Sequence, residues 1–229
     1  MEREIDLIKK IVADSSYFQP QHIRHEKDRA AAGLSIIFFE LLKSMIAAFD
    51  AKSRWGVEII SRSCFEYYVK IINIVIKDNY WSIQRYDAEH DIKHLNKIGD
   101  KNSILTIHAE NETIENFRND RKSIIYRAEM EGAIKDFNIY KQFCSIDAEH
   151  FYRTVYWYLS NISHGNCGVV LQVWPKDDDL YEDTIKPNIF HGARLGAELI
   201  VRLQSHFGEI GICIEPYEAY LLEVGENPG

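Results

Sequence analysis

Two short segments of this sequence contain the residue types best suited to chemistry. The first is RSCFE, which places Arg62 and Glu66 four residues apart in an otherwise apolar stretch. The second is YWYLSNISHGN, which runs from aromatic residues into Ser163 and His164. A guanidinium, a carboxylate, a hydroxyl and an imidazole can together bind an anion or move a proton if the fold brings them to one place. Arg62, Glu66, Ser163 and His164 are therefore the candidate catalytic residues.

The helix predicted around the first segment limits what its charged pair can do. The apolar residues of RWGVEIISRSCFEYYVKIINIVIK recur at helical spacing on two sides, which predicts a central helix of a bundle over 54–77. We expect Arg62 and Glu66 to be at least half buried, and a buried charge has to be paired. The pair is either a structural ion pair or part of a functional site. Charged residues recur every four positions along this helix: Arg54, Glu58, Arg62, Glu66 and Lys70.

The second segment predicts the end of another helix. Ser160 and His164 fall on one helical face, with Ser163 beside it. In the last turn, the helix dipole favours a protonated imidazole. His164 could simply cap its own helix, or it could face the first segment across the bundle. We predict that His164 contacts the Arg62–Glu66 pair directly or through one water.

Helical spacing extends over most of the chain and predicts an all-α fold. The expected helices besides 54–77 cover about 2–13, 20–51, 80–97, 103–130, 133–144, the segment ending at His164, 187–206 and 215–224. Pro20 and Pro187 are expected to open their helices. The stretch GVVLQVW resembles a strand and predicts a small β-hairpin near residues 168–184. With no repeat or linker in the sequence, we expect a single multi-helix bundle over residues 1–229.

Composition favours a soluble cytoplasmic protein. The 229 residues carry a net charge of −8, which weighs against broad binding to nucleic acid but not against a local basic site. The four cysteines form no C-x-x-C pair, as is typical of reduced thiols. The start, MEREIDLIKKIVAD, does not resemble a signal peptide. The run GLSIIFFELLKSMIAAF is interrupted by Glu40 and Lys43, so we expect no membrane span.

Metal chemistry has one weak candidate. HDIKH places His90 and His94 one helical turn apart, an arrangement similar to the zinc motif H-E-x-x-H. Asp91 is a shorter arm than the Glu of that motif, and no third ligand is identifiable. A solvated helix face is the preferred interpretation, so we expect no metal and no cofactor.

The RSCFE and YWYLSNISHGN segments together resemble those of a bacterial family of helical proteins of unknown function. Members are similar in having an R-x-x-x-E helix and a helix end like Y-x-x-L-S-x-x-x-H-G, here RSCFE and YWYLSNISHG. The resemblance covers about residues 35–170. It implies that Arg62, Glu66, Ser160 and His164 matter together, without indicating what they do.

A more remote resemblance is to the HEPN (higher eukaryotes and prokaryotes nucleotide-binding) group. These helical bundles are often dimeric ribonucleases of phage defence or toxin–antitoxin pairs, and carry an Arg followed after four to six residues by a His. Arg85 and His90 have this spacing, but about one such match is expected by chance. Arg153 lies eleven residues before His164, which departs from the motif. The resemblance implies a defence-associated ribonuclease or nucleotide-binding protein.

Three hypotheses about function remain, and whether the protein is an enzyme stays open among them. The first is a HEPN-like ribonuclease or nucleotide-binding protein that uses Arg62, Glu66, Ser163 and His164 on a phosphate. The second is a non-enzymatic module with a buried Arg/Glu/His network that binds a partner protein or itself. The third is a metal hydrolase on the HDIKH segment.

Assembly is predicted from aromatic residues that we expect to be exposed. Together with the HEPN resemblance, these residues predict a homodimer. RNA, a nucleotide or a partner protein are the other expected partners. The aromatic residues are Tyr80, Trp81, Tyr217 and Tyr220.

Overall fold

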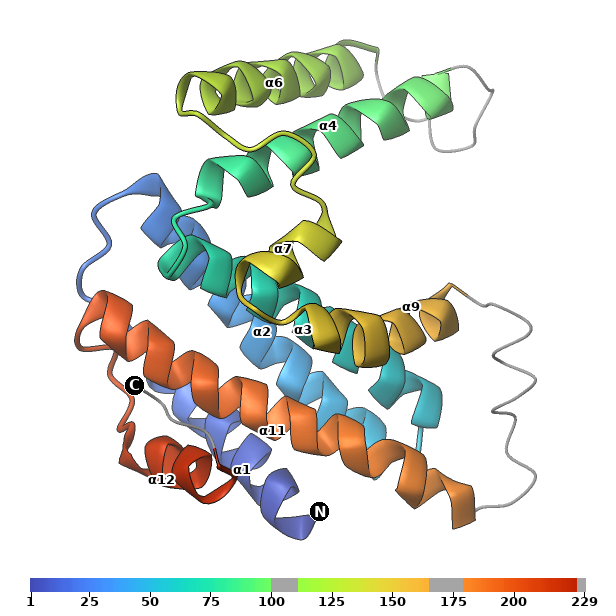
Figure 1. Cartoon of the computed structure of the whole chain (residues 1–229), viewed down its shortest axis with the longest axis vertical. Coiled ribbons are helices and arrows are strands. Elements are labelled where there is room, and N and C mark those ends of the chain that lie inside the picture. Colours follow the sequence, from blue (N-terminus) through green and yellow to red (C-terminus); the bar gives the residue numbers. More distant parts are fainter. Residues whose placement is uncertain (100–110, 165–178, 226–229) are drawn as a thin grey trace. The chain divides into compact units, whose positions relative to one another are not determined.

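A computed structural model describes residues 1–99, 111–164 and 179–225 (Figure 1), with the backbone alone at 97–99, 111–112 and 179–184. All regular secondary structure in these residues is helical, which confirms the all-α class. The chain divides into two compact units, one of residues 1–77 with 143–229 and one of residues 78–142. Whether these two units fold together as the predicted single domain over residues 1–229 is not tested by this division, and the single domain stays a prediction.

The larger unit is built around α3. This helix contacts α2, α9 and α11, and its side chains at Val57, Cys64 and Ile71 have almost no exposure. Because these positions are seven residues apart, they form one buried stripe along the helix. The helices of this unit are α1 (Glu2–Asp14), η1 (Ser15–Tyr17), α2 (Glu26–Asp50), α3 (Arg54–Val75), α8 (Glu149–Phe151), η2 (Tyr152–Tyr156), α9 (Trp157–Ser163), α11 (Asp179–Phe207) and α12 (Glu215–Glu223).

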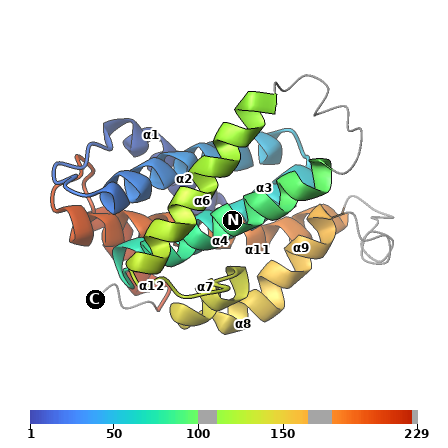
Figure 2. The ribbon, with the colours of Figure 1, turned by 90° about the horizontal axis from the view of Figure 1, so that it is seen from above.

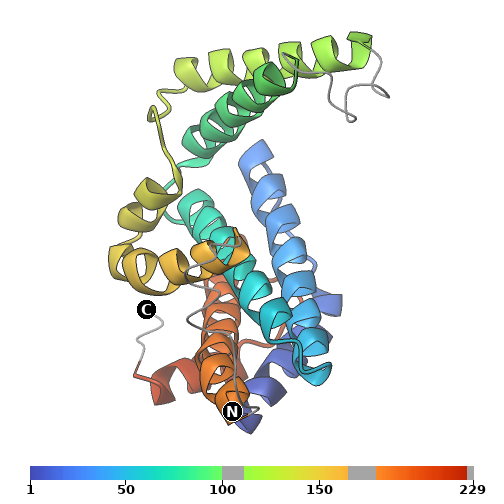
Figure 3. The same cartoon turned by 90° about the vertical axis from the view of Figure 1, so that its right-hand side faces the viewer.

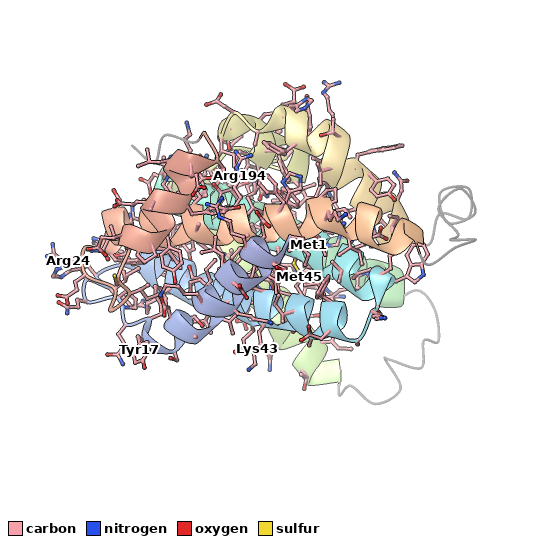
Figure 4. The ribbon with its side chains drawn as sticks, turned by 90° about the horizontal axis from the view of Figure 1, so that it is seen from below. Met1, Tyr17, Arg24, Lys43, Met45 and Arg194 are labelled. Atoms are coloured by element: carbon pink, nitrogen blue, oxygen red, sulfur yellow. The ribbon has the colours of Figure 1, made fainter. Side chains whose placement is uncertain are left out.

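Two glycines allow α11 to pack closely on α1 and α2. A Cβ added at Gly196 would lie 2.7 Å from Ile11 Cδ1 and 3.0 Å from Leu42 Cδ1. A Cβ at Gly192 would lie 2.9 Å from Met45 Sδ. Met45 comes from α2 and lies beside α11 and α1 (Figure 4). The absence of a side chain at these two positions allows the three helices to approach this closely.

The smaller unit is a helical pair with its own contacts. Its helices are α4 (Tyr80–Gly99) and α6 (Asn111–Met130), which pack side by side (Figure 3). Arg85 of α4 forms ion pairs of 2.9 Å with Glu89 and with Glu129 of α6. The Arg127 guanidinium lies over the Trp81 ring at 4.4 Å. The boundary between the two units falls within α7 (Ile139–Ser145).

The start of α2 differs from the prediction. We expected Pro20 to open this helix, but it begins at Glu26. Asp28, a buried residue, accepts hydrogen bonds from the backbone N–H groups of His25 at 2.9 Å and Arg24 at 3.1 Å. These bonds satisfy donors that lack partners in the first turn. The capping side chain, rather than the proline, therefore defines where the helix begins.

Two further boundaries were predicted wrongly. The last long helix does not open at Pro187, because α11 begins at Asp179 and carries this proline in its interior. Residues 179–184 are thus helical and cannot form the end of the predicted hairpin; its residues 168–178 lie outside the described part. The helix expected at 133–144 covers only Ile139–Ser145, since Asp136 has a φ of 54° that interrupts a helix.

The long apolar helix α2 bears on the expected absence of a membrane span. Within the described residues, it alone is long and apolar enough to cross a membrane by length and composition. The core helix of a soluble protein passes the same test, and α2 packs against α3 and α1. The absence of a membrane partner stays a prediction.

Most of the aromatic residues expected on the surface are in fact buried. Tyr80, Tyr217 and Tyr220 are each at most 5% exposed, and Trp81 is partly buried. The ring of Tyr217 is held by a hydrogen bond from its hydroxyl to Asp14 at 2.6 Å. These residues therefore do not support the predicted homodimer.

Candidate functional site

Side chains of three helical segments meet at the predicted site. Arg62 Nη1 donates to Ser163 Oγ at 2.8 Å, and its Nη2 lies 2.8 Å from Glu66 Oε1. The Tyr156 hydroxyl donates to the same Glu66 oxygen at 2.6 Å and accepts a long bond of 3.5 Å from Arg62. We call these four residues the α3–α9 polar cluster. Their bonds join α3 to η2 and α9.

The cluster is partly buried and carries balanced charge. The side chains of Arg62 and Glu66 are 22% and 30% exposed, in agreement with the expectation that they are at least half buried. Burial alone would lower the pKa of Arg62, but its bonds to Tyr156 and Glu66 outweigh burial and raise that pKa. Burial and the bond to Glu66 raise the pKa of Tyr156. Tyr156 therefore remains a protonated donor at neutral pH.

The side chain of His164 does not join this cluster. His164 is exposed and ends α9, where its backbone N–H donates to the Ser160 carbonyl at 3.1 Å. Within the described residues, its imidazole makes no hydrogen bond or ion pair, so the predicted direct contact with Arg62 and Glu66 is not found there. The physical reason is helix geometry, since successive residues point about 100° apart and Ser163 already faces α3.

Ser160 contributes its backbone rather than its hydroxyl. Its carbonyl oxygen accepts from the Ser163 hydroxyl at 3.0 Å as well as from the His164 N–H. The Ser163 hydroxyl is thus oriented between this carbonyl and the Arg62 guanidinium. The structure brings together Arg62, Glu66 and Ser163 as predicted and adds Tyr156.

Tyr156 was not among the candidate residues, although it belongs to the second segment. It ends η2, a π-helical segment between α8 and α9 within one continuous helix (Figure 2). The rings of Tyr152 and Tyr156 stack with centroids 5.2 Å apart. Single π-helical turns inside α-helices occur frequently at functional sites. The seven-residue spacing of Tyr156 and Ser163, which places both on one face, was the available signal.

A second Arg–Glu pair lies two turns earlier on α3. Arg54 Nε and Glu58 Oε1 are 3.2 Å apart, and both side chains are at most 6% exposed. Burial raises the pKa of Glu58, and Arg54 opposes that shift only in part. With so little exposure, this pair offers no surface for a ligand.

The residues of the other motifs lie on α4 of the smaller unit. His90 and His94 are exposed on α4, and no group of three His, Cys, Asp or Glu within the described residues could hold a metal ion. Arg85, the arginine of the HEPN-like spacing, is engaged in its two ion pairs with Glu89 and Glu129. The rings of His90 and Tyr86 lie with their centroids 6.4 Å apart.

This all-α chain belongs to a family that is defined by sequence alone. It belongs to a family of unknown function, DUF5677, whose family model matches residues 28–180. This span includes both Arg–Glu pairs and the whole α3–α9 polar cluster. No curated protein and no solved structure matches the chain. The resemblance to a family of unknown function is thereby confirmed, while the HEPN resemblance stays a prediction.

Proposed function

We propose that the α3–α9 polar cluster, with His164 beside it, is a phosphate-directed site of a ribonuclease or nucleotide-binding protein. The observation that carries this proposal is convergence: Arg62 and Ser163 are 101 positions apart in the chain and bond directly. Arg62 comes from the RSCFE segment and Ser163 from the YWYLSNISHGN segment, the two segments that the sequence predicts to contain catalytic residues. The π-helical segment at Tyr156 and the partial exposure of Arg62 add support.

Each residue has a role that its chemistry allows. Arg62 would bind a phosphate oxygen through its guanidinium, as arginine does in many phosphate sites. The hydroxyls of Ser163 and Tyr156 now donate to the Ser160 carbonyl and to Glu66. Each has a single hydrogen, so either hydroxyl would have to rotate away from its present acceptor to donate to the phosphate. Glu66 positions Arg62, and His164, adjacent to Ser163 and open to solvent, would transfer a proton as general acid or base.

The charges of the polar cluster and of the whole chain limit the size of the phosphate compound that the site would bind. Glu66 already neutralises much of the charge of Arg62, so an incoming phosphate has to compete with it. The net charge of −8 opposes extended contact with a long polyanion. A mononucleotide or a short single-stranded RNA fits these conditions better than duplex nucleic acid.

The test compares His164→Ala and Arg62→Gln with the wild type in RNA degradation and in nucleotide binding. We expect both variants to lose activity. His164→Ala should leave the melting temperature unchanged, because the described residues make no bond to its imidazole. Arg153→Gln is the control, since Arg153 is exposed and bonds Glu149 on its own helix. Wild-type protein inactive on RNA and nucleotides, or a fully active His164→Ala, would contradict the proposal.

A second candidate is the non-enzymatic module, favoured by a separate observation. Each residue of the polar cluster bonds to at least one other member, and an alternative role of these bonds is to hold η2 and α9 against α3. In that case Arg62→Gln lowers the melting temperature, and neither variant changes any activity on phosphate compounds.

The homodimer also remains a proposal, although the aromatic residues from which it was predicted are mostly buried. Exposed apolar residues of the larger unit support it, each at least 43% exposed in the single chain. Light scattering should give twice the chain mass of 26.7 kDa. A monomer mass over a wide concentration range would remove this proposal. The residues are Ile36, Ile37, Ile59 and Trp157.

A further inference from the structure

The larger unit contains a cavity that the polar cluster does not use. Its volume is about 180 Å³, and it is lined by residues of α3, α7, α8 and α11 and of the turn between α7 and α8. Phe65, Phe143 and Phe151 supply aromatic walls, while His191 and Glu198 add polar groups. Since a cavity of about 150 Å³ accommodates benzene, this space is large enough for one aromatic ring but not for a whole nucleotide.

His191 is the most unusual residue of this lining. Its ring lies against three phenylalanine rings, with centroids 5.6 Å from Phe65, 5.9 Å from Phe151 and 5.7 Å from Phe190. Neither of its nitrogens forms a hydrogen bond with a residue that the structure describes. Burial, with a contribution from the positive charge of Arg194, lowers the pKa of His191 to about 4. A neutral imidazole of this kind offers one donor and one acceptor.

Three charged residues line the cavity: Arg194, Glu198 and Asp147. Asp147 is exposed, so water screens its charge, and the charges that a bound ring would meet are those of Arg194 and Glu198. Arg194 also lies over the Phe151 ring at 5.3 Å, and Glu198 lies 3.7 Å from Arg202. Burial and the bond to Glu198 raise the pKa of Tyr68, so this hydroxyl stays protonated beside the carboxylate. An anionic ligand would face Glu198 and a cationic one would face Arg194, so a neutral ligand is favoured.

We propose that this cavity binds a neutral single-ring heteroaromatic molecule of pyrimidine size. The ring would stack among the phenylalanine side chains, and its polar edge would exchange hydrogen bonds with His191. A buried polar edge requires such a partner, and this is the chemistry that an unbonded imidazole supplies. The proposal is independent of the phosphate-directed site, since none of its residues belongs to the polar cluster.

Saturation-transfer NMR and calorimetric titration with uracil as probe test the inference. Benzoate and benzylamine serve as charged rings of similar size, and indole as a larger neutral one. We expect uracil to bind and the charged rings to bind about tenfold more weakly or not at all. No binding of uracil at millimolar concentration, or stronger binding of either charged ring, overturns the proposal.

Two variants locate the bound ring. His191→Phe keeps an aromatic ring but removes the hydrogen bonds, so uracil affinity should fall about tenfold. Ala148→Trp places a large side chain at the edge of the cavity and should abolish binding even if His191→Phe fails to fold. His94→Phe, a change at an exposed histidine of the smaller unit, is the matched control. Uracil binding that survives Ala148→Trp would contradict the assignment to this cavity.

The proposal and the phosphate-directed site can fail separately. Arg62→Gln should leave uracil binding unchanged, because Arg62 does not line the cavity. Conversely, His191→Phe should not alter RNA degradation. Parallel loss of both properties in either variant would show that the two sites are not independent.

Discussion

The two Arg–Glu pairs of α3 have the same spacing on the same helix but different surroundings. Arg54 and Glu58 are almost fully buried, at 6% and 1% exposure. Arg62 and Glu66 keep 22% and 30% exposure, and they bond to Tyr156 and Ser163 of the neighbouring helix. The i, i+4 spacing alone therefore does not determine the role of such a pair; the burial of the pair by neighbouring helices does.

This difference has energetic consequences. A buried ion pair costs much of its own attraction in lost hydration, so each partner depends on the other. A partly exposed pair retains water around it and tolerates exchange of partners. The first pair therefore suits a fixed structural role, and the second has the exposure that the proposed phosphate binding requires.

The largest expected effect comes from breaking the buried pair. Arg54→Met leaves Glu58 buried without its cation and should lower the free energy of unfolding by about 3–5 kcal/mol. Urea denaturation followed by circular dichroism measures this change. Replacing both residues, as Arg54→Met with Glu58→Leu, should restore most of the loss. A single variant as stable as the wild type would show that the pair is not structural.

Breaking the partly exposed pair should cost less. Arg62→Met removes the cation from Glu66, which can still be hydrated, and should lower the free energy of unfolding by about 1–2 kcal/mol. The same denaturation experiment applies. A loss equal to that of Arg54→Met would remove the contrast between the pairs.

The hydroxyl of Tyr156 should have a smaller effect again. Tyr156→Phe keeps the ring stacked on Tyr152 but removes the bonds to Glu66 and Arg62, at an expected cost of about 0.5–1.5 kcal/mol. Tyr126→Phe is the control, because it removes the hydroxyl of an exposed tyrosine of α6. Equal costs for both variants would mean that the bond to Glu66 adds no stability.

The smallest effect concerns pH. Because burial raises the pKa of Glu58, the folded chain holds this proton at pH values where the unfolded chain has released it. Stability from this residue is therefore greatest below its unfolded pKa of 4.5 and is lost as pH rises through the raised folded pKa. The wild type should show this decline in melting temperature, and Glu58→Gln should lack it. An identical pH profile in both proteins would contradict the raised pKa.

Sequence patterns predicted helix positions and burial well, but they predicted poorly which distant residues contact one another. The bounds of α1, α3 and α12 follow from the spacing of apolar residues, and the burial of Arg62 and Glu66 from the two apolar sides of their helix. The start of α2 was missed because it depends on the carboxylate of Asp28. One oxygen of this carboxylate accepts the two backbone bonds, and the other lies 3.2 Å from Nε2 of His206 in α11. The orientation of His164 was missed because Ser163, its neighbour, takes the position facing α3.

The π-helical segment η2 gives this helix an unusual tolerance to changes in length. A π-helical turn contains one more residue than an α-helical turn, so the deletion of one residue there would restore an ordinary α-helix. Arg153 and Thr154 are exposed, and removing either would keep the flanking side chains on their faces while tightening the turn that carries Tyr156. Relatives that differ by a single-residue gap in this segment would thus share the helix but differ in the position of the tyrosine hydroxyl.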